Sequence, residues 1–180
     1  MRARVARWYP ALKVEFFLPW DDAQCAAQVD ALLAAFGAEG LVTHAESLSL
    51  PAPGSDESMM LHSIATAMHL PIERHFIAIA LLAASGSGTM NRTTLLAATA
   101  QVARRCGLLQ GAAGFGLADR PAIDRAIDNL LEGGMVREVD GVVCFDETLK
   151  QSGDADSALL SEDTGRAIAN AVRLAPANRV

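Results

Sequence analysis

The chain has 180 residues, of which 51% are hydrophobic and 5% aromatic, and its formal net charge is −6. This much apolar side-chain surface can build a core, which excludes an intrinsically disordered chain. Alanine and leucine supply much of that surface. Because these residues favour closely packed helices over a β-sandwich, the composition predicts a mainly α-helical protein of one domain, with or without appendages.

Charged side chains are unevenly distributed along the chain. Residues 1–13 contain Arg2, Arg4, Arg7 and Lys13 and no acid, so this leader carries +4 and the remainder carries −10. An acidic body binds nucleic acid poorly, because phosphate contacts need dense lysine and arginine. A basic leader is compatible with anionic lipid headgroups or with an acidic neighbouring domain.

Cysteine usage and the length of the apolar runs exclude further classes of protein. Cys25, Cys106 and Cys144 lie far apart and form no C-x-x-C pair, which fits a reducing cytosol and indicates neither a disulfide framework nor a zinc site. The most apolar stretch, residues 76–84, is nine residues long, against roughly 20 for a membrane-spanning helix. We expect a soluble or peripheral protein with no metal and no cofactor.

The N-terminal third predicts one helix between irregular segments. Residues 8–20 contain two prolines, and a residue before proline avoids the helical region, so extended or irregular structure is expected there. Asp21 or Asp22 can cap a helix that runs to about Phe36 and ends at the glycines that follow. Short extended pieces are expected at residues 41–42 and 48–50.

A long helical segment is predicted over residues 55–84. Ser55 can cap it, and the two acids in its first turn suit the positive end of a helix dipole. Apolar residues keep a spacing of three or four straight through Pro71, so we predict two helices nearly in line, or one kinked helix, rather than a turn. The apolar stripe consists of Leu61, Ile64, Met68, Ile72, Phe76, Ile79 and Leu82.

Two further helices are predicted after this segment. Asn91 can cap a helix that runs to about Cys106, and the glycine-rich residues 107–116 are expected to form a loop. Asp119 then caps a helix that has a proline in its first turn. Over residues 121–132 this helix carries three acids and a single arginine, so DNA phosphates would repel it.

A β-hairpin is predicted over residues 135–145, because Asp140-Gly141 joins two short apolar-rich runs. Residues 151–157 are polar and expected to form a loop, and a weak terminal helix is expected over about 158–173. The predicted fold is thus a helical bundle with a small C-terminal β-hairpin. Over residues 72–145 the order helix, helix, helix, hairpin is that of a winged helix, a module that reads DNA or docks proteins.

These patterns divide the chain into four parts. They are a basic and aromatic leader over 1–20 that packs on a missing upstream domain, a helix with short extended segments over 21–54, a helical domain with the hairpin over 55–150, and a polar linker with the weak terminal helix over 151–180.

Two segments could be taken for ligand sites but favour ordinary structure. His62, His69 and Glu73 could share a helix face and hold a metal, yet Pro71 perturbs their register, and a solvated face is the preferred interpretation. Residues 86–92 could form a phosphate loop, but they lack its Gly-Lys-Ser/Thr ending and follow a helix, so a helix–helix connection is preferred. The chain has no Gly-x-Ser-x-Gly elbow for nucleophilic hydrolysis.

A basic and aromatic cluster is the main interface candidate. Five of the nine aromatic residues fall within 13 positions beside the leader arginines, and they could equally fill the core or form a contact surface. The charged pair after Pro71 is either a docking element or, as we prefer, a charged turn whose acid complements the helix dipole. The candidate interface residues are Arg4, Arg7, Trp8, Tyr9, Phe16, Phe17, Trp20, Glu73 and Arg74.

Two segments are notable for their order and spacing: residues 9–20, YPALKVEFFLPW, and residues 73–82, ERHFIAIALL. Together they resemble the C-terminal region of the bacterial membrane-associated glycerol-3-phosphate acyltransferases. Pro51-Ala-Pro53, the stretch from Arg104 to Phe115 and the helix end at 130–134 are also similar to that family. The resemblance covers the chain from about residue 7 through the hairpin, and more weakly to residue 174.

The resemblance implies part of an enzyme that transfers a fatty acyl group from acyl-CoA or acyl carrier protein to the 1-hydroxyl of glycerol 3-phosphate, the first step of phospholipid synthesis. In that family an H-x-x-x-x-D motif carries the transfer, with its histidine as general base. Here the fifth residues after the four histidines are Ser49, Ala67, Arg74 and Ala80. We therefore assign no catalytic residue and expect the chain to be inactive alone, a C-terminal part whose own enzyme status is uncertain.

The same resemblance implies partners and a location. The partners are an upstream acyltransferase domain and an anionic membrane surface, with no nucleic acid. The location is the bacterial cytoplasm, peripheral on the cytoplasmic face of the inner membrane. The alternative function is a winged-helix-like protein-interaction or regulatory module.

Overall fold

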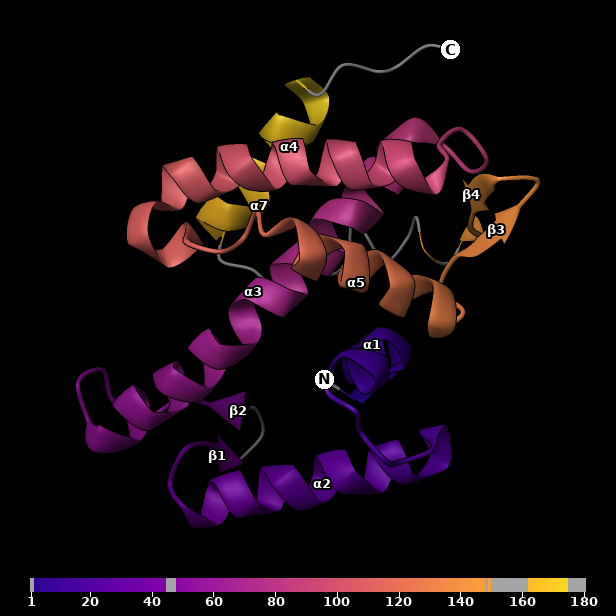
Figure 1. Cartoon of the computed structure of the whole chain (residues 1–180). Coiled ribbons are helices and arrows are strands. Elements are labelled where there is room, and N and C mark those ends of the chain that lie inside the picture. The colour runs from indigo at the N-terminus through magenta and orange to yellow at the C-terminus, as the bar shows by residue number, and fades with distance from the viewer. Residues whose placement is uncertain (1, 45–47, 148, 150–161, 175–180) are drawn as a thin grey trace. The chain divides into compact units, whose positions relative to one another are not determined.

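The computed structural model describes residues 2–44, 48–147, 149 and 162–174. It is mainly helical and has a small antiparallel hairpin near the C-terminus, which confirms the predicted fold class (Figure 1). The chain forms two compact units, one of residues 1–9 and 19–69 and the other of residues 10–18 and 70–180. Helices α1 and α3 each contribute residues to both units.

The first unit contains α2, which spans Asp22–Ala38. Its start is fixed by a capping box, in which the Gln24 amide donates to the Asp21 carboxylate at 2.7 Å and the Gln24 side chain accepts from the Asp21 amide at 3.0 Å. Two of the orphan donors at the helix start are therefore satisfied, as the sequence predicted. The chain leaves the helix through Gly40, whose φ of 71° favours glycine.

Two antiparallel strands of two residues each follow, β1 (Thr43–His44) and β2 (Leu48–Ser49). The first predicted extended piece was placed at Leu41 and Val42, whereas β1 begins two residues later. Leu41 and Val42 are buried and lie just before this strand. Ser55 then caps α3, with the Ser58 amide donating to its hydroxyl at 3.1 Å.

The expectation of irregular structure over residues 8–20 was wrong, because α1 spans Arg2–Glu15 and includes Pro10. A proline inside a helix removes one backbone hydrogen bond and crowds the preceding turn. Here burial offsets that cost: Trp8, Tyr9 and Ala11 are at most 4% exposed. Tertiary packing therefore overrides the local preference of the chain.

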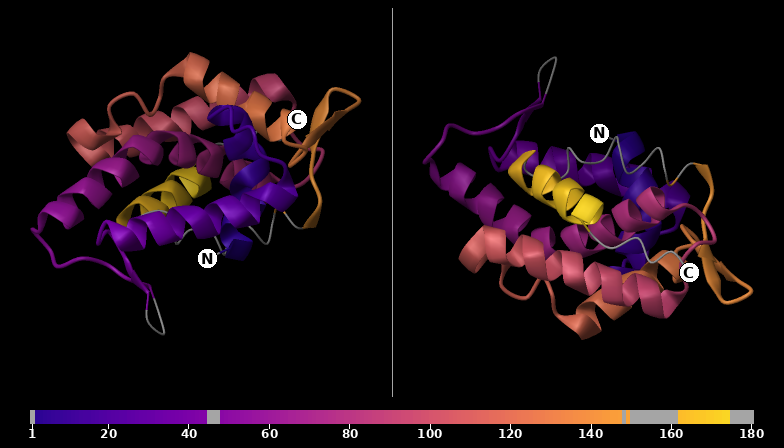
Figure 2. Two further views of the ribbon diagram at one scale, coloured as in Figure 1. Left: turned by 90° about the horizontal axis from the view of Figure 1, so that it is seen from below. Right: turned by 90° about the horizontal axis from the view of Figure 1, so that it is seen from above.

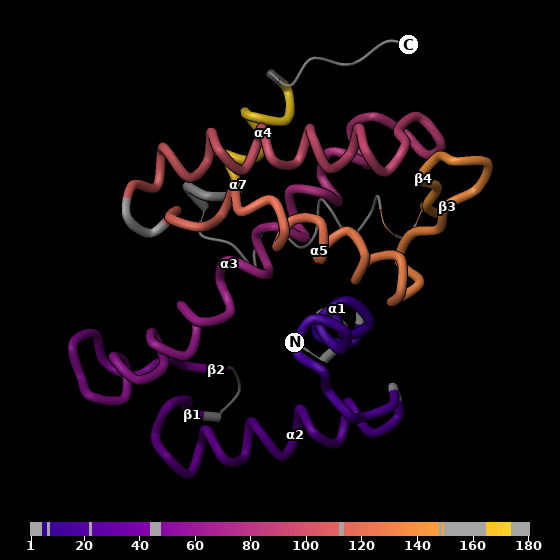
Figure 3. The backbone as a smooth tube through the Cα atoms, in the orientation of Figure 1, coloured from indigo at the N-terminus to yellow at the C-terminus, as the bar shows by residue number. Residues whose placement is uncertain are grey.

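Helix α3 spans Asp56–Ser85 and includes Pro71, which confirms that no turn occurs at this proline (Figure 3). Its C-terminal half forms the core of the second unit, where Ile77, Ile79 and Leu82 are fully buried. By length and composition α3 could cross a membrane, a test that core helices of soluble proteins also meet. The expectation that no segment spans a membrane was based on the uninterrupted apolar run alone, and it stays a prediction.

Among its described residues the second unit also contains the helices α4 (Arg92–Gln110), α5 (Arg120–Glu132) and α7 (Glu162–Leu174). Asn91 and Asp119 cap the first two as predicted, and α7 packs along α4 (Figure 2). The predicted 107–116 loop was partly wrong, since α4 continues to Gln110 and the 3₁₀ helix η1 covers Gly111–Gly114.

The C-terminal segments bear out the hairpin and part of the terminal helix. The terminal helix is confirmed over the described residues, whereas the predicted loop at 151–157 and residues 158–161 lie outside them. Strands β3 (Arg137–Val139) and β4 (Val142–Cys144) pair through the predicted Asp-Gly turn, which confirms the order helix, helix, helix, hairpin.

An ion pair between α4 and α5 gives two of the acids on α5 a structural role. One nitrogen of the Arg92 guanidinium lies 2.7 Å from an Asp124 oxygen and 2.6 Å from an Asp128 oxygen. The two carboxylates are four residues apart on one helix face and would repel each other without the arginine. They stabilise the packing of α4 on α5.

His75 is the buried titratable group of α3. Its ring is fully buried, its Nδ1 donates to the Pro71 carbonyl at 2.7 Å, and its Nε2 has no hydrogen-bond partner among the described atoms. Burial lowers the pKa of His75 below its ordinary value of 6.5, more strongly than the hydrogen bond to Pro71 raises it. The folded protein therefore holds a neutral imidazole.

We predict that stability falls as pH drops below 6.5, the ordinary pKa of this group, because the unfolded histidine then binds a proton that the folded one resists. The measurement is urea unfolding at about pH 7.5 and about pH 5.5. His75→Gln should shrink the difference between the two pH values, whereas substitution of the exposed His62 by Gln should leave it unchanged. An equal pH dependence in both variants would contradict the prediction.

Two glycine-to-alanine substitutions should have opposite effects. A Cβ on Gly114 would lie 2.5 Å from the Gly107 Cα, so Gly114→Ala should cost about 1–3 kcal/mol by overpacking backbone. A Cβ on Gly37, inside α2, would meet nothing closer than 3.9 Å. Gly37→Ala should therefore stabilise the helix by about 0.5–1 kcal/mol. Chemical denaturation measures both, and a stable Gly114→Ala protein would refute the close contact.

Candidate functional site

Glu73 and Arg74 lie in the middle of α3, not in a turn, and both reach toward the connection between α4 and α5. Glu73 is fully buried, and its carboxylate accepts a hydrogen bond from the Gln110 side chain at 2.9 Å. The Arg74 guanidinium donates to the carbonyls of Gly116 at 2.7 Å and Leu117 at 3.3 Å. The two side chains therefore position this connection from inside the same unit.

Burial, with a smaller contribution from the charge of Glu73, sets the protonation of a nearby thiol. Burial raises the pKa of Cys106 to about 11, and the negative charge of Glu73 acts in the same direction. Burial lowers the pKa of Arg74, while Asp119, Glu15 and Glu73 favour its charged form. Since the thiolate is the nucleophilic form of cysteine, Cys106 is a buried apolar group and not a nucleophile at neutral pH.

The connection itself, residues 104–117, is named here the α4 tip. It is compact, because Gly107 and Gly114 approach so closely that neither has room for a side chain without backbone movement. Leu117 is fully buried and anchors the return of the chain. Three large apolar side chains nevertheless point away from the core: Leu108, Leu109 and Phe115 are 79%, 74% and 88% exposed.

The structure separates the candidate interface residues into different environments. Trp8 and Tyr9 are buried, and the Tyr9 hydroxyl donates to the Trp20 carbonyl at 2.7 Å. Phe16 and Trp20 are half-buried, and Phe17 is 86% exposed. The side chains of Arg4 and Arg7 lie outside the described part of the structure, although their backbone belongs to α1. A contact role for this set stays a prediction.

The solvated helix face predicted for His62, His69 and Glu73 is wrong for Glu73, which is fully buried. Within the described residues no three His, Cys, Asp or Glu side chains are grouped as a metal site would require. The segment 86–92 connects α3 to α4 and is tied to the hairpin: the Ser87 hydroxyl donates to the Phe145 carbonyl at 3.0 Å and accepts from the Phe145 amide at 2.9 Å.

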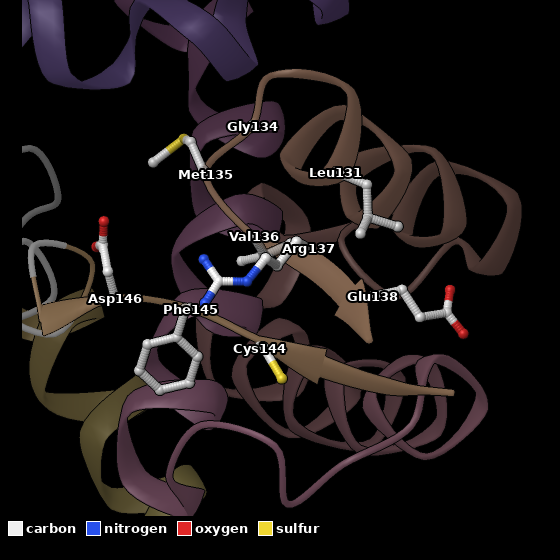
Figure 4. Close-up of a pocket in the computed structure, with 9 residues that line it drawn as sticks. All are labelled: Leu131, Gly134, Met135, Val136, Arg137, Glu138, Cys144, Phe145 and Asp146. Carbon is white, nitrogen blue, oxygen red and sulfur yellow. The ribbon is translucent and has the colours of Figure 1, made fainter. Parts of the chain in front are cut away.

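A pocket of about 360 Å³ lies beside the hairpin. Arg137 extends toward the side of Met135 and Phe145, while Glu138 points the other way (Figure 4). The lining also includes a half-buried thiol, Cys144, but no histidine. The residues around the pocket are Leu131, Gly134, Met135, Val136, Arg137, Glu138, Cys144, Phe145 and Asp146.

The exposed surface of the α4 tip was missed as a site at the level of sequence. The resemblance included Arg104, Arg105 and Phe115, but only as similar positions. A signal was present: residues 92–118 contain three arginines and no acid, in a chain that is acidic overall. Periodicity alone could not show that the two leucines face outward, because apolar residues near a helix end usually pack inward.

Comparison with known proteins identifies the family of this chain. Residues 1–139 match the family model described as the glycerol-3-phosphate acyltransferase C-terminal region. A glycerol-3-phosphate acyltransferase of Xylella fastidiosa (strain M12) is 27% identical over 161 residues, 86% of this chain and 19% of its own length. One of Pseudomonas putida (strain W619) is 30% identical over 130 residues, 72% of this chain and 16% of its own length.

The chain spans less than a fifth of the length of these curated relatives, at 19% and 16%. No solved structure matches it. The family model covers most of the chain, including both segments whose order and spacing suggested the resemblance. The chain therefore belongs to the family of glycerol-3-phosphate acyltransferase C-terminal regions.

Proposed function

We propose that this chain is the non-catalytic C-terminal part of a glycerol-3-phosphate 1-O-acyltransferase and supports an upstream catalytic part by packing against it. The observation that carries the proposal is the family match over residues 1–139, together with relatives of the same name that extend well beyond the matched region. The reaction is transfer of an acyl group from acyl-CoA or acyl carrier protein to the 1-hydroxyl of glycerol 3-phosphate, which opens phospholipid synthesis.

The chemistry of the buried groups supports a structural role for this part. None of the four histidines is followed five residues later by aspartate, so no H-x-x-x-x-D motif can supply a general base. His75 is buried as a neutral ring, and Cys106 is a buried thiol with a raised pKa. Glu73 holds the α4–α5 connection through Gln110. These groups lie in the core, where they have no access to a substrate.

The second candidate, a winged-helix-like interaction module, has weaker support. The order of elements from α3 to β4 fits it. Its third helix, however, uses Asp124 and Asp128 to bind Arg92 of the neighbouring helix. A surface committed to an internal ion pair is less available for a partner, so the acyltransferase role is the better account.

We predict that the purified 180-residue chain makes no acylglycerol phosphate from palmitoyl-CoA and radiolabelled glycerol 3-phosphate, because it lacks the H-x-x-x-x-D motif. The companion protein is the Xylella fastidiosa relative with its matched 161 residues replaced by this chain. It should be clearly more active than the same relative truncated before that region. Activity in the isolated chain, or a chimera no better than the truncated relative, would contradict the proposed function.

We further propose that the protein works as a peripheral protein at the cytoplasmic face of the bacterial inner membrane. The charge of +4 in residues 1–13 supports this location, since each cation near an anionic bilayer contributes about 1 kcal/mol. Trp8 and Tyr9 are buried, so the proposed contact is made by the cations and not by these rings.

Replacement of Arg2, Arg4 and Arg7 by Gln should weaken flotation of the chain with phosphatidylglycerol vesicles on the order of a hundredfold. The matched control replaces three exposed arginines elsewhere, Arg120, Arg125 and Arg137, and has the same change in net charge. Flotation that falls equally in both variants would show only a net-charge effect, and flotation unchanged by the leader substitutions would eliminate the leader as a membrane contact.

A further inference from the structure

The α4 tip displays apolar side chains where a soluble surface would carry polar ones. Leu108, Leu109 and Phe115 are each at least 74% exposed. They lie at the end of α4 that is remote from the β3–β4 hairpin, which contacts the other end through the Met90–Val143 bridge (Figure 1). Three large apolar groups within eight positions make a projecting apolar point, which marks an interaction site.

Two cations stand directly behind this apolar point. Arg104 and Arg105 precede Leu108 and Leu109 by four residues each, so each arginine shares a helix face with one leucine, about 6 Å back along the axis. No acid occurs between Arg92 and Asp119. Among the described residues neither Arg104 nor Arg105 makes an ion pair. Their charge is therefore available to an anionic partner.

The backbone of the tip is held from inside the protein. Gln110 is bonded to the buried Glu73, and Arg74 supplies donors to the carbonyls of Gly116 and Leu117. Backbone carbonyls outside regular helices are costly to place in a medium that offers no hydrogen bonds. Internal donors to two carbonyls of the tip lower that cost, while the apolar side chains stay outside.

We propose that the α4 tip is a membrane wedge: Leu108, Leu109 and Phe115 enter an anionic bilayer while Arg104 and Arg105 bind lipid phosphates at the headgroup level. An apolar point with cations about one helix turn behind it matches an interface in which apolar groups sink about 5–10 Å. A projecting tip of net positive charge fits a deformable anionic surface. The inference rests on the proposed membrane location and adds a contact separate from the leader.

Flotation of the 180-residue chain with phosphatidylglycerol-containing vesicles tests the wedge. The variant Leu108→Gln, Leu109→Gln, Phe115→Gln should bind at least about tenfold more weakly than the parent chain. The control variant Leu50→Gln, Met59→Gln, Met60→Gln alters three other exposed apolar residues of the first unit and should bind like the parent. Equal binding of the wedge variant and the parent, or equal loss in both variants, would overturn the proposal.

The arginines are tested separately. Arg104→Gln with Arg105→Gln should weaken binding to anionic vesicles by about fivefold for each arginine and leave the weak binding to pure phosphatidylcholine vesicles unchanged. Unchanged binding of this double variant to anionic vesicles would overturn the assignment of the lipid phosphate contact.

A tryptophan at the tip gives a local readout. Phe115→Trp should shift its fluorescence to the blue and be quenched by brominated lipid when anionic vesicles are added, after subtraction of the parent signal. A blue shift without vesicles would indicate a protein contact, and no shift with vesicles would indicate exposure to water; either would overturn the wedge.

Failure of the wedge can be told apart from failure of the proposed function. In the chimera assayed in detergent micelles, where no bilayer is present, the three-residue wedge variant should keep its acyl transfer. Loss of vesicle binding with retained activity supports the wedge. Loss of micellar activity would instead make the tip part of the packing against the catalytic part and overturn its assignment to the bilayer.

Discussion

The burial of the second half of α3 is the constraint on which the second unit depends. This helix places a carboxylate and an imidazole in an apolar core and a half-buried guanidinium beside them, and each group needs a specific partner. Gln110 bonds Glu73, the carbonyls of the α4 tip bond Arg74, and the Pro71 carbonyl bonds His75. Because polar groups in the core tolerate few arrangements, they fix where α4 ends and how the chain returns to α5.

The same burial explains why an enzyme-like inventory of residues does not make an active site. A histidine, a cysteine and a glutamate occur within one core, but burial keeps the imidazole neutral and the thiol protonated. A buried neutral imidazole and a buried protonated thiol affect the stability of the fold, and neither is exposed to a substrate. The family match identifies a C-terminal region, and these three buried groups belong to its core.

Local rules predicted most of the helix starts and the hairpin. Asp21, Asn91 and Asp119 each accept the backbone hydrogen bond that a cap requires, and Asp140-Gly141 forms the turn between β3 and β4. These features depend on residues within four positions, so the sequence states them directly. Pro10 shows the limit of such rules. Its neighbours are buried by residues far away in the chain, which local sequence does not indicate, and α1 forms with the proline inside it.

By itself the sequence determined the family, the helical class, the caps and the absence of an H-x-x-x-x-D motif, because each is a matter of residue order and short-range spacing. Only the tertiary structure decided which side of each helix is covered. It placed Glu73 inside, although a charged residue after a proline is usually solvated, and it left Leu108 and Leu109 outside, although leucine is usually buried. Burial depends on contacts between residues far apart in the chain, such as Arg74 with Gly116, and no local pattern encodes those.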